Sequence, residues 1–411
     1  MNEIELLEYG IYHDVLGKEK SDCIPGIRQD GLIDIEYFEN ILKDSNGIDT
    51  VSEIELWLSR SLPEWINKQD STPLILCSGG VDSSSLVATL NSKDAYLLHT
   101  SYVNHDNNDL QKLCRLLDEF PLRVEINSIS EYEYLTGLLS LIKKEIPQNT
   151  YGPSIEYALS NKRYSKDHKC LITGSAPDEL FYGMEKYSFD HFKKLDGIPI
   201  EKAMERLDVN YNSTAFDLIL NSNGKDLARQ IDLKRKKLYK GISSVYGSIY
   251  DAQRLLAYST VTTQHMKMYN DISDGIGLRH VAPFMNEDLV KLSFSTPVMS
   301  LVDVSLGTNN VEIGKKHLKK MLAKYMPKQH VHSKKIGFHA PVTKYLYHEL
   351  YREYFNKILD SPPLKGVVNE EKLKKLVVSR LNSKNKKEIY SDYFLYAILN
   401  IFLFERRHDN K

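Results

Sequence analysis

The sequence predicts an α/β protein: a parallel sheet flanked by helices, with a largely helical C-terminal half and a small N-terminal appendage. Between positions 73 and 173, short continuous apolar runs alternate with segments of helical periodicity, a pattern typical of βαβ units around a buried parallel sheet. The chain has 411 residues, of which 42% are hydrophobic and 27% charged. These values are ordinary for a folded protein and allow two or three domain-sized cores, because domains usually hold about 100–200 residues.

The first seventy residues differ in character from the rest. Residues 8–30 mix aromatic, charged, glycine and proline residues without a sustained period, which indicates short strands and loops. Apolar residues recur three and four apart over 34–43 and over 51–66, so both stretches are predicted helices, and Pro63 can divide the second into two. We expect residues 1–70 to be a short N-terminal region that leads into a larger domain, 71–411.

The larger domain begins with a predicted strand in a continuous apolar run. The predicted strands are 74–77, 95–103, 122–126 and 169–173. A helix is expected at 108–119. From about residue 200 onward the pattern is mostly helical and includes a charged segment, 226–240, that is predicted to be an exposed helix. We therefore divide the domain into a strand-rich core, 71–195, and a mainly helical part, 196–411.

Charge and cysteine content argue against several classes of protein. Fifty-four Lys and Arg against 55 Asp and Glu give a formal net charge of −1, so there is no strong nucleic-acid signal. The four cysteines, at 23, 77, 114 and 170, form no CxxC pair, and a zinc ribbon, an iron–sulfur cluster and a disulfide framework are all unexpected. We see neither a secretory signal nor an apolar run of roughly 18 residues. The prediction is a soluble, cytoplasmic protein without a membrane partner.

The most informative segment directly follows the first predicted strand. It comprises Ser78, Gly79, Gly80, Val81, Asp82, Ser83 and Ser84. The glycines let the backbone turn sharply, and the amides before a helix N-terminus form a cradle for an anion, to which the serine hydroxyls add donors. Asp82 would repel a phosphate, but it is explained if Mg²⁺ lies between carboxylate and phosphate. The lysine of the GxxxxGK[ST] pattern is missing, so γ-phosphate transfer is not expected. The structural alternative is a Gly/Ser turn that caps a helix.

Four segments together resemble a known enzyme family. Residues 78–84 resemble the PP-loop of ATP pyrophosphatases, enzymes that cleave ATP between its α- and β-phosphates. Residues 173–183 resemble the SGxGxDExFGG segment of the asparagine synthetase family, and residues 277–286 are similar to its GLExRxPFLD. Residues 333–341 resemble its RxKxGFxxP, with Ser333 in place of the arginine. The segments occur in the family order, which is more specific than any single motif.

The resemblance implies a Rossmann-like, nucleotide-binding core at 71–195 and the activation of a carboxylate. The substrate attacks the α-phosphorus of MgATP, pyrophosphate leaves, and ammonia or an amine then displaces AMP to form an amide. In the family the carboxylates matching Asp82 and Asp178 hold magnesium, and the lysine matching Lys335 stabilises negative charge in the transition states. The positions implied to bind ATP or pyrophosphate are Leu76, Ser78, Gly79, Gly80, Val81, Asp82, Ser83, Ser84, Val103, Thr173, Gly174 and Lys335. The alternatives are that Asp178 caps a helix after Pro177 and that Lys335 is a solvated charge.

The chain also departs from the family pattern. The family's glutaminase needs a cysteine directly after the initiator methionine, where this chain has Asn2, and seventy residues are too few for that domain. We therefore expect nitrogen from free ammonia, an amine or a separate glutaminase. Ser175 stands in place of a glutamate that can assist the amine, and a serine is no general base. Arg279, Val281 and Asn286 replace charged family residues on the presumed substrate side, which makes aspartate a doubtful substrate.

We thus expect an ATP-dependent, AMP-forming carbon–nitrogen ligase with ATP and Mg²⁺ as cofactors. Its substrate would be a small-molecule or peptide carboxylate, and its candidate pocket residues are Ser175, Arg279 and His280. Two alternatives stay open. One is a PP-loop enzyme that adenylates a nucleobase in RNA, although such proteins commonly carry cysteine pairs or a basic surface. The other is a degenerate ATP-binding subunit, against which the intact Asp82, Asp178 and Lys335 argue.

Overall fold

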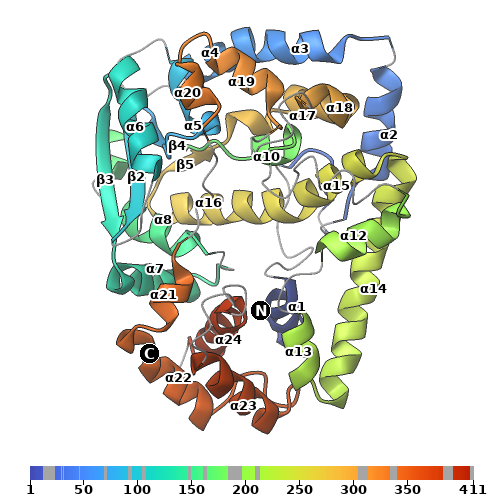
Figure 1. Cartoon of the computed structure of the whole chain (residues 1–411), viewed down its shortest axis with the longest axis vertical. Coiled ribbons are helices and arrows are strands. Elements are labelled where there is room, and N and C mark those ends of the chain that lie inside the picture. The colour runs from blue at the N-terminus through green and yellow to red at the C-terminus, as the bar shows by residue number, and fades with distance from the viewer. Residues whose placement is uncertain are drawn as a thin grey trace.

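The computed structural model shows an α/β protein built around one parallel sheet (Figure 1). The structure describes residues 1–12, 24–28, 30, 32–45, 47–68, 72–90, 95–103, 108–146, 150–160, 164–183, 197–208, 213–303, 313–333, 340–382 and 392–407. Helices flank the sheet, and the C-terminal half is largely helical, so the fold class predicted from the sequence is confirmed.

The described strands all run parallel. They are β1 (Leu74–Leu76), β2 (Tyr96–Tyr102), β3 (Arg123–Ile129), β4 (Cys170–Ile172) and β5 (Arg279–Val281). Their spatial order is β3-β2-β1-β4-β5, so the chain adds β2 and β3 on one side of β1 and then β4 and β5 on the other. At such a reversal the loops that leave the two central strands diverge. The carboxyl ends of β1 and β4 are therefore where a ligand is expected to bind.

Helices make up most of the described residues, and capping residues mark the start of some of them. In chain order they are α1 (Glu3–Tyr12), α2 (Ile35–Asp44), α3 (Thr50–Leu56), η1 (Trp57–Ser61), α4 (Leu62–Asn67), α5 (Val81–Ala88), α6 (Asn108–Glu119), α7 (Glu131–Lys143), α8 (Gly152–Leu159), α9 (Tyr164–Asp167), α10 (Pro177–Leu180), α12 (Ile200–Asp208), α13 (Ser213–Ile219), α14 (Ser222–Val245), α15 (Ile249–Ala257), η2 (Tyr258–Thr262), α16 (Thr263–Gly275), η3 (Pro283–Met285), α17 (Glu287–Ser295), α18 (Val298–Leu301), α19 (Lys316–Leu322), α20 (Lys328–Val331), α21 (Val342–Leu346), α22 (Glu349–Asp360), α23 (Glu370–Leu381) and α24 (Asp392–Glu405). Asp34 accepts the Tyr37 N–H at the start of α2, and Ser130 with Glu133 forms a capping box on α7.

Hydrophobic side chains alternate between the two faces of the sheet, as the period of a strand requires. Ile75 and Leu97 point into the larger core, which also contains buried residues of α5, α6, α17 and α19. Leu74 and Leu98 point the other way, where buried residues of α8 and α16 cover them. The sheet is thus buried on both faces, which explains why its strands appear in the sequence as continuous apolar runs.

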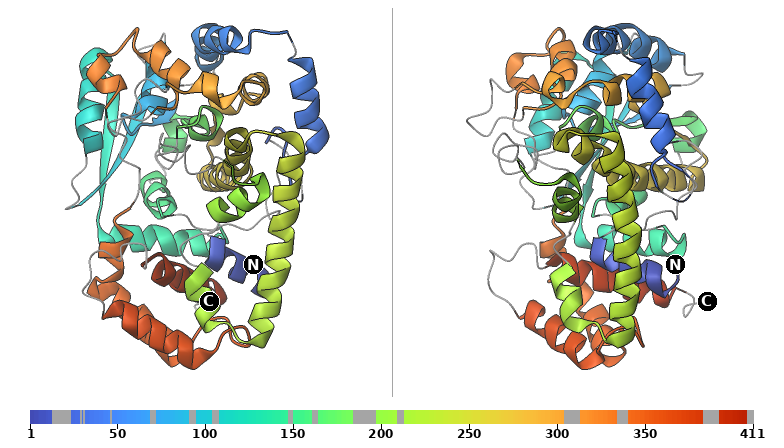
Figure 2. Two further views of the ribbon diagram at one scale, coloured as in Figure 1. Left: turned by 45° about the vertical axis from the view of Figure 1, so that its right-hand side comes forward. Right: turned by 90° about the vertical axis from the view of Figure 1, so that its right-hand side faces the viewer.

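A second core lies beside the first, below it in Figure 1, and contains residues of α1, α7, α13 and α21 to α24. Its central helix, α24, is buried from Phe394 to Phe404, as expected of a helix that is apolar on all sides. The first seventy residues take part in both cores. Helix α1 contacts α14 and α24, whereas α2 and α3 contact α17 at the other end of the molecule (Figure 2). No helix among the described residues is long and apolar enough to cross a lipid bilayer.

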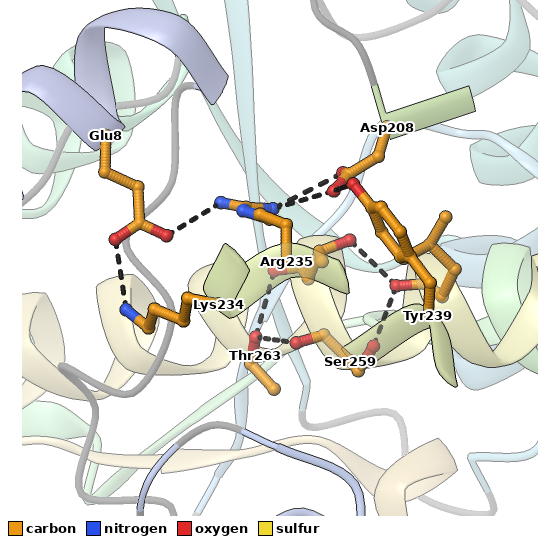
Figure 3. A network of polar contacts seen from close by, with 9 residues as sticks. Glu8, Asp208, Lys234, Arg235, Tyr239, Ser259 and Thr263 are labelled. Atoms are coloured by element: carbon orange, nitrogen blue, oxygen red, sulfur yellow. Dashed lines mark hydrogen bonds and ion pairs between the residues drawn. The ribbon is translucent and has the colours of Figure 1, made fainter. Parts of the chain in front are cut away.

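A buried ion-pair network fastens α1 to the helical part of the chain (Figure 3). The Arg235 side chain of α14 has no exposed surface; its Nη2 lies 3.3 Å from Glu8 Oε1 and its Nη1 lies 3.1 Å from Asp208 Oδ2. Lys234 Nζ lies 3.1 Å from the second oxygen of Glu8, and the Tyr239 hydroxyl donates to Asp208 at 2.6 Å. Burial lowers the pKa of Arg235, and the charge of Glu8 opposes that shift. Removing either carboxylate would leave the buried Arg235 charge only partly compensated, by the other carboxylate.

The elements depart from the prediction in four places. Residues 8–12, which were predicted to form short strands and loops, belong to helix α1. Strand β5 was not predicted, because its three residues carry no strand pattern of their own and pair only because β4 offers a parallel edge. The segment 51–66 is continuously helical: a π-helical turn, η1, joins α3 to α4, and Pro63 falls in the first turn of α4, where no backbone donor is needed. The segment 226–240 is helical as predicted, but Arg235 within it is buried rather than exposed.

Candidate active site

The loop from β1 to α5 is a tight turn that packs against α6. Gly79 has a φ of +77°, and a Cβ at this position would lie 2.5 Å from the backbone nitrogen of Leu113. Only glycine fits there without a shift of the chain. The buried Cys77 that precedes the turn has a pKa raised to about 11 by burial, so its thiol stays protonated and is no nucleophile at neutral pH.

Serine hydroxyls stabilise this turn from within. The Gly80 N–H donates to Ser78 Oγ at 3.2 Å, and the Ser83 hydroxyl donates to the Gly80 carbonyl at 3.3 Å. Gly80 is also the N-cap of α5 and has no side chain that could accept from the first-turn amides. Those amides and the positive end of the helix dipole therefore favour an anion, as the sequence predicted for a phosphate-binding loop.

The buried His330 side chain contacts the glycine turn through Ser84. The Ser84 hydroxyl donates to the Gly79 carbonyl at 3.1 Å, and His330 Nε2 of α20 lies 3.0 Å from Ser84 Oγ. Because the serine proton is already used, Nε2 is the donor to Ser84. Burial lowers the pKa of His330 to about 4, with smaller contributions from the charges of Arg115 and Lys112. The imidazole is therefore neutral at neutral pH.

The loop after β4 is in contact with the first turn of α5. A Cβ on Gly174 would lie 3.1 Å from Asp82 Cβ, so the absence of a side chain lets the two loops approach. Ala176, the N-cap of α10, has a φ of +81°, and α10 then presents Asp178 in its first turn. Asp82 and Asp178 thus come from the ends of two neighbouring strands and lie at the same edge of the sheet.

Lys315 joins these two carboxylates. Its Nζ lies 2.6 Å from Asp82 Oδ2 and 2.5 Å from Asp178 Oδ1. The two oxygens are therefore at most about 5 Å apart, because both contact the same nitrogen. The lysine side chain is 2% exposed, whereas the carboxylates are 23% and 29% exposed. An ammonium from the buried side and two acidic groups open to solvent form the centre of the site.

Three residues around Lys315 have left-handed backbone conformations. Ala176, Tyr182 and Lys315 have φ values of +81°, +57° and +59°, which side-chain-bearing residues rarely adopt. Each costs on the order of 1–3 kcal/mol and persists only when the surroundings require it. A Cβ on Gly183 would overlap the Lys315 stem at 2.0 Å, and one on Gly314 would overlap the Tyr182 carbonyl at 1.7 Å. Such clusters of strain are typical of functional sites.

A chain of hydrogen bonds leads away from the same loop. Ser175 Oγ lies 2.9 Å from Thr173 Oγ1, which lies 2.8 Å from His280 Nε2 of β5. His280 Nδ1 lies 2.7 Å from Asn270 Oδ1 of α16. The Tyr269 ring lies 5.3 Å from the imidazole and holds it in place. Burial lowers the pKa of His280 to about 3, so this imidazole is also neutral.

Comparison with known proteins agrees with this geometry. A family model described as "Asparagine synthase" matches residues 68–398, most of the chain. The chain belongs to the asparagine synthase family. Membership confirms the resemblance carried by the four motifs and supports an ATP-dependent, amide-forming enzyme.

Other comparisons add little to the family assignment. Among solved structures the chain is similar to the NH3-dependent NAD synthetase from Campylobacter jejuni subsp. jejuni NCTC 11168, in complex with nitrate, at 14% sequence identity. The similarity covers 46% of this chain and 96% of that chain with a TM-score of 0.25, too low to support an argument about fold or function. No curated protein matches the chain.

The residues at the centre fit the magnesium that the asparagine synthase family implies. Carboxylate oxygens are the ligands this ion prefers, and the Lys315 ammonium between them marks a position where a cation is stable. Among the described residues, no group of three or more His, Cys, Asp or Glu side chains could hold a metal. Asp82 and Asp178 would therefore hold Mg²⁺ together with substrate phosphates, the usual arrangement for this ion in nucleotide sites.

The other family positions fall in different surroundings. Leu76 and Val103 lie at the carboxyl ends of β1 and β2, next to the phosphate-binding loop in the order of the sheet. Arg279 pairs with Cys170 at the amino end of β4, is exposed, and is not brought into the group around Asp178. Asn286 caps α17, where it accepts the Asp288 N–H at 3.0 Å.

One residue from the sequence analysis cannot be located, and one important residue was not anticipated. Lys335 lies outside the described residues. Lys315 was not singled out, because lysines are frequent in this part of the chain. A signal was present nonetheless: Lys315 precedes Leu318 by three and Leu322 by seven residues, so it continues the apolar stripe of α19. A lysine at a position that helical periodicity assigns to the interior is a candidate for a buried charge partner.

Proposed function

We propose that this protein is an ATP-dependent carbon–nitrogen ligase that adenylates a substrate carboxylate, releases pyrophosphate and transfers the acyl group to ammonia or an amine, with AMP leaving. One observation carries the proposal most directly: two carboxylates from adjacent strand ends share a single ammonium beside a glycine turn that favours anions. A nucleotide triphosphate with its metal matches that distribution of charge.

The proposed roles follow from the position of each group. The turn formed by Gly79 and Gly80 would hold phosphate oxygens by backbone amides at the start of α5. Asp82 and Asp178 would bind Mg²⁺, which when bound neutralises phosphate charge and orients the triphosphate. Lys315 places one positive charge between the two carboxylates, and its flexible stem would let the ammonium pair with phosphate oxygens once the metal takes its place. Lys335 is proposed to stabilise charge in the transition states.

The substrate is proposed to be a specialised small-molecule or peptide carboxylate rather than aspartate. The sequence departures at Arg279, Val281 and Asn286 suggested this, but the structure places Arg279 at the amino end of β4 and Asn286 as the cap of α17, so the proposal rests mainly on Ser175, which replaces a family glutamate beside Asp178. Ammonia, an amine on a second substrate or a separate glutaminase would provide the nitrogen. A cytoplasmic location stays a prediction from the sequence.

Pyrophosphate exchange tests the proposal because it detects adenylation without an amine. The full-length protein is incubated with MgATP, labelled pyrophosphate and a panel of carboxylic acids that includes peptides with acidic side chains. Label entering ATP only in the presence of an acid, together with AMP formation when an amine is added, supports the ligase. Exchange that depends on RNA instead of an acid would favour the nucleobase-adenylating alternative. ATP binding without exchange under all conditions would indicate a degenerate subunit.

A further inference from the structure

Helix α10, which carries Asp178, is too short to hold its own position. It has four residues, begins after the strained Ala176 and ends at Leu180. An isolated helix of one turn is unstable in water, because the cost of ordering its first turn is not offset by further hydrogen bonds. The place of Asp178 is therefore set by the elements against which α10 packs, which include α15 and α17 (Figure 1).

Two buried side chains bind the carbonyl group that ends α10. Arg254 of α15 donates from Nη1 to the Leu180 oxygen at 3.2 Å, and the Ser293 hydroxyl of α17 donates to the same oxygen at 2.6 Å. Both directions are fixed, because a carbonyl oxygen only accepts. The two bonds use both lone pairs of that oxygen, and neither the Arg254 nor the Ser293 side chain is exposed to solvent.

Arg254 also joins α10 to the end of α17. Its Nη1 donates to the Ser293 carbonyl at 3.0 Å, and its Nη2 donates to the Thr296 carbonyl and to Asp251 Oδ1, both at 3.2 Å. The last turn of a helix has unpaired carbonyls and the negative end of the dipole, which favour a cation. The terminal nitrogens of a guanidinium offer four N–H groups for these four acceptors, whereas an ammonium has only three and lacks the planar fork.

The segment that follows α10 fixes the backbone of Lys315. The Lys315 N–H donates to the Phe181 carbonyl at 2.7 Å, one residue beyond Leu180. The Asp178 carbonyl accepts the Gly183 N–H at 2.7 Å, which closes the chain over the same turn. Along the chain, the anchored Leu180 carbonyl thus lies between Asp178 and the backbone contact of Lys315. A shift at this carbonyl would move both members of the ion pair.

We propose that Arg254 and Ser293 are positioning residues that hold Asp178 where it binds the metal ion. The proposal rests on the proposed function, from which it takes the Mg²⁺ shared by Asp82 and Asp178. Both residues act through the backbone of α10 and are not catalytic residues. Without one of these anchors α10 would leave this position for part of the time, and the affinity for the metal would fall with the fraction of molecules in the competent arrangement.

The test compares ATP binding with and without metal, because only the metal-dependent part requires Asp178. The full-length protein is titrated calorimetrically with ATP in MgCl₂ and in EDTA, without a carboxylic acid, and the ratio of the two Kd values reports the contribution of the metal. In Ser293→Ala we expect this ratio to fall about 3- to 10-fold, which corresponds to one hydrogen bond, while the Kd in EDTA stays at the parent value. Ser295→Ala is the matched control: this serine of the same helix donates to the Leu292 carbonyl within α17, and its loss should leave the ratio unchanged.

A conservative variant separates positioning from packing. Ser293→Thr keeps the hydroxyl donor but adds a methyl group at a fully buried position, which should lower the midpoint of urea unfolding. We expect its ratio to stay near that of the parent, in contrast to Ser293→Ala. Arg254→Lys keeps the charge but loses the fork, and it should lower the ratio at least as much as Ser293→Ala. If Arg254→Lys does not fold, the two Ser293 variants decide.

The outcomes distinguish the positioning role from the function on which it rests. If the ratio follows the urea midpoint in both Ser293 variants, or is the same in Ser293→Ala and the parent, the anchor serves only the fold and the proposal is wrong. If the parent binds ATP equally well in MgCl₂ and in EDTA, the metal site is wrong and the positioning role with it. An absence of pyrophosphate exchange with every acid would overturn the ligase function alone, because the binding ratio is measured without an acid and still decides the role of Ser293.

Discussion

Replacing Lys315 by methionine is the most direct perturbation of the proposed metal site. Methionine keeps most of the stem volume that fits against Gly183 but removes the ammonium that contacts Asp82 and Asp178. The variant is left with two carboxylates and no cation between them. We expect two consequences: a loss of stability without metal, and a new ability to be stabilised by Mg²⁺ alone.

The size of the first effect can be estimated from the geometry. One charge-assisted hydrogen bond, to Asp82, and one ion pair, to Asp178, disappear; a charge-assisted hydrogen bond is worth about 1.5–3 kcal/mol, and burying a thioether in place of an ammonium offsets part of the loss. The carboxylate oxygens, at most about 5 Å apart, then repel each other by about 3 kcal/mol at an effective dielectric constant of about 20 and by less than about 1 kcal/mol in water. Since both groups are about a quarter exposed, the lower part of that range applies. We expect the free energy of unfolding to fall by about 2–3 kcal/mol.

The second effect is measured as the shift of urea unfolding between EDTA and MgCl₂. Mg²⁺ at about ten times its Kd adds about 1.4 kcal/mol of stability to a site it occupies. In the parent protein the ion must first displace the ammonium, so its stabilisation by Mg²⁺ without nucleotide should be clearly smaller. Lys316→Met is the matched control, because the neighbouring Lys316 is exposed and its loss should change neither quantity.

The reasoning would be refuted by an equal Mg²⁺ response in the parent and in Lys315→Met. That result would mean that the ammonium and the metal do not compete for the same oxygens. Unchanged stability of Lys315→Met in EDTA would likewise contradict the ion-pair geometry on which the site is built.

Three further predictions concern groups around the same centre. Asp82→Asn and Asp178→Asn should each reduce pyrophosphate exchange to background while the circular dichroism spectrum is retained, because a neutral amide is a poor ligand for Mg²⁺; residual exchange above a tenth of the parent's would argue against a shared ion. Lys335→Ala should remove turnover without lowering the melting temperature, and full turnover would show that this lysine is only a surface charge. The pKa of His330 near 4 lies below the value of about 6.5 for an unfolded histidine, so the unfolded chain binds the extra proton first and stability falls by about 1.4 kcal/mol per pH unit below pH 6.5. His330→Gln keeps an N–H donor for Ser84 but cannot take up a proton. Between pH 7 and pH 5 its free energy of unfolding should therefore fall by about 2 kcal/mol less than that of the parent. An equal fall in parent and variant would contradict a lowered pKa of His330.

The parts of the site that lie close together in the sequence were predictable from it. An apolar run predicts strand β1, and the two glycines that follow it predict the turn. The return of helical spacing predicts the start of α5, and all three features lie within fifteen residues. The helix at 108–119 was predicted with the bounds that the structure has, because its apolar face is regular and uninterrupted. The two short strands β4 and β5 differed in how far the sequence predicted them. The apolar run of β4 predicted a strand, whereas β5 has no strand pattern of its own and is recognised only by its pairing with β4.

The sequence by itself determined the family, the parallel sheet and the two acidic residues placed after strands, since each depends on local backbone preference or on a contiguous motif. Only the tertiary structure decided that Lys315, 233 residues from Asp82, is their shared partner. It likewise decided that His280 Nε2, 107 residues from Thr173, lies 2.8 Å from the Thr173 hydroxyl. Helical periodicity places Lys315 on the buried side of α19, but no periodic or compositional pattern identifies the partner of either residue, because partners that meet only after the chain folds back are selected by packing and charge at the contact. Local backbone propensity therefore does not predict which distant side chains will be in contact.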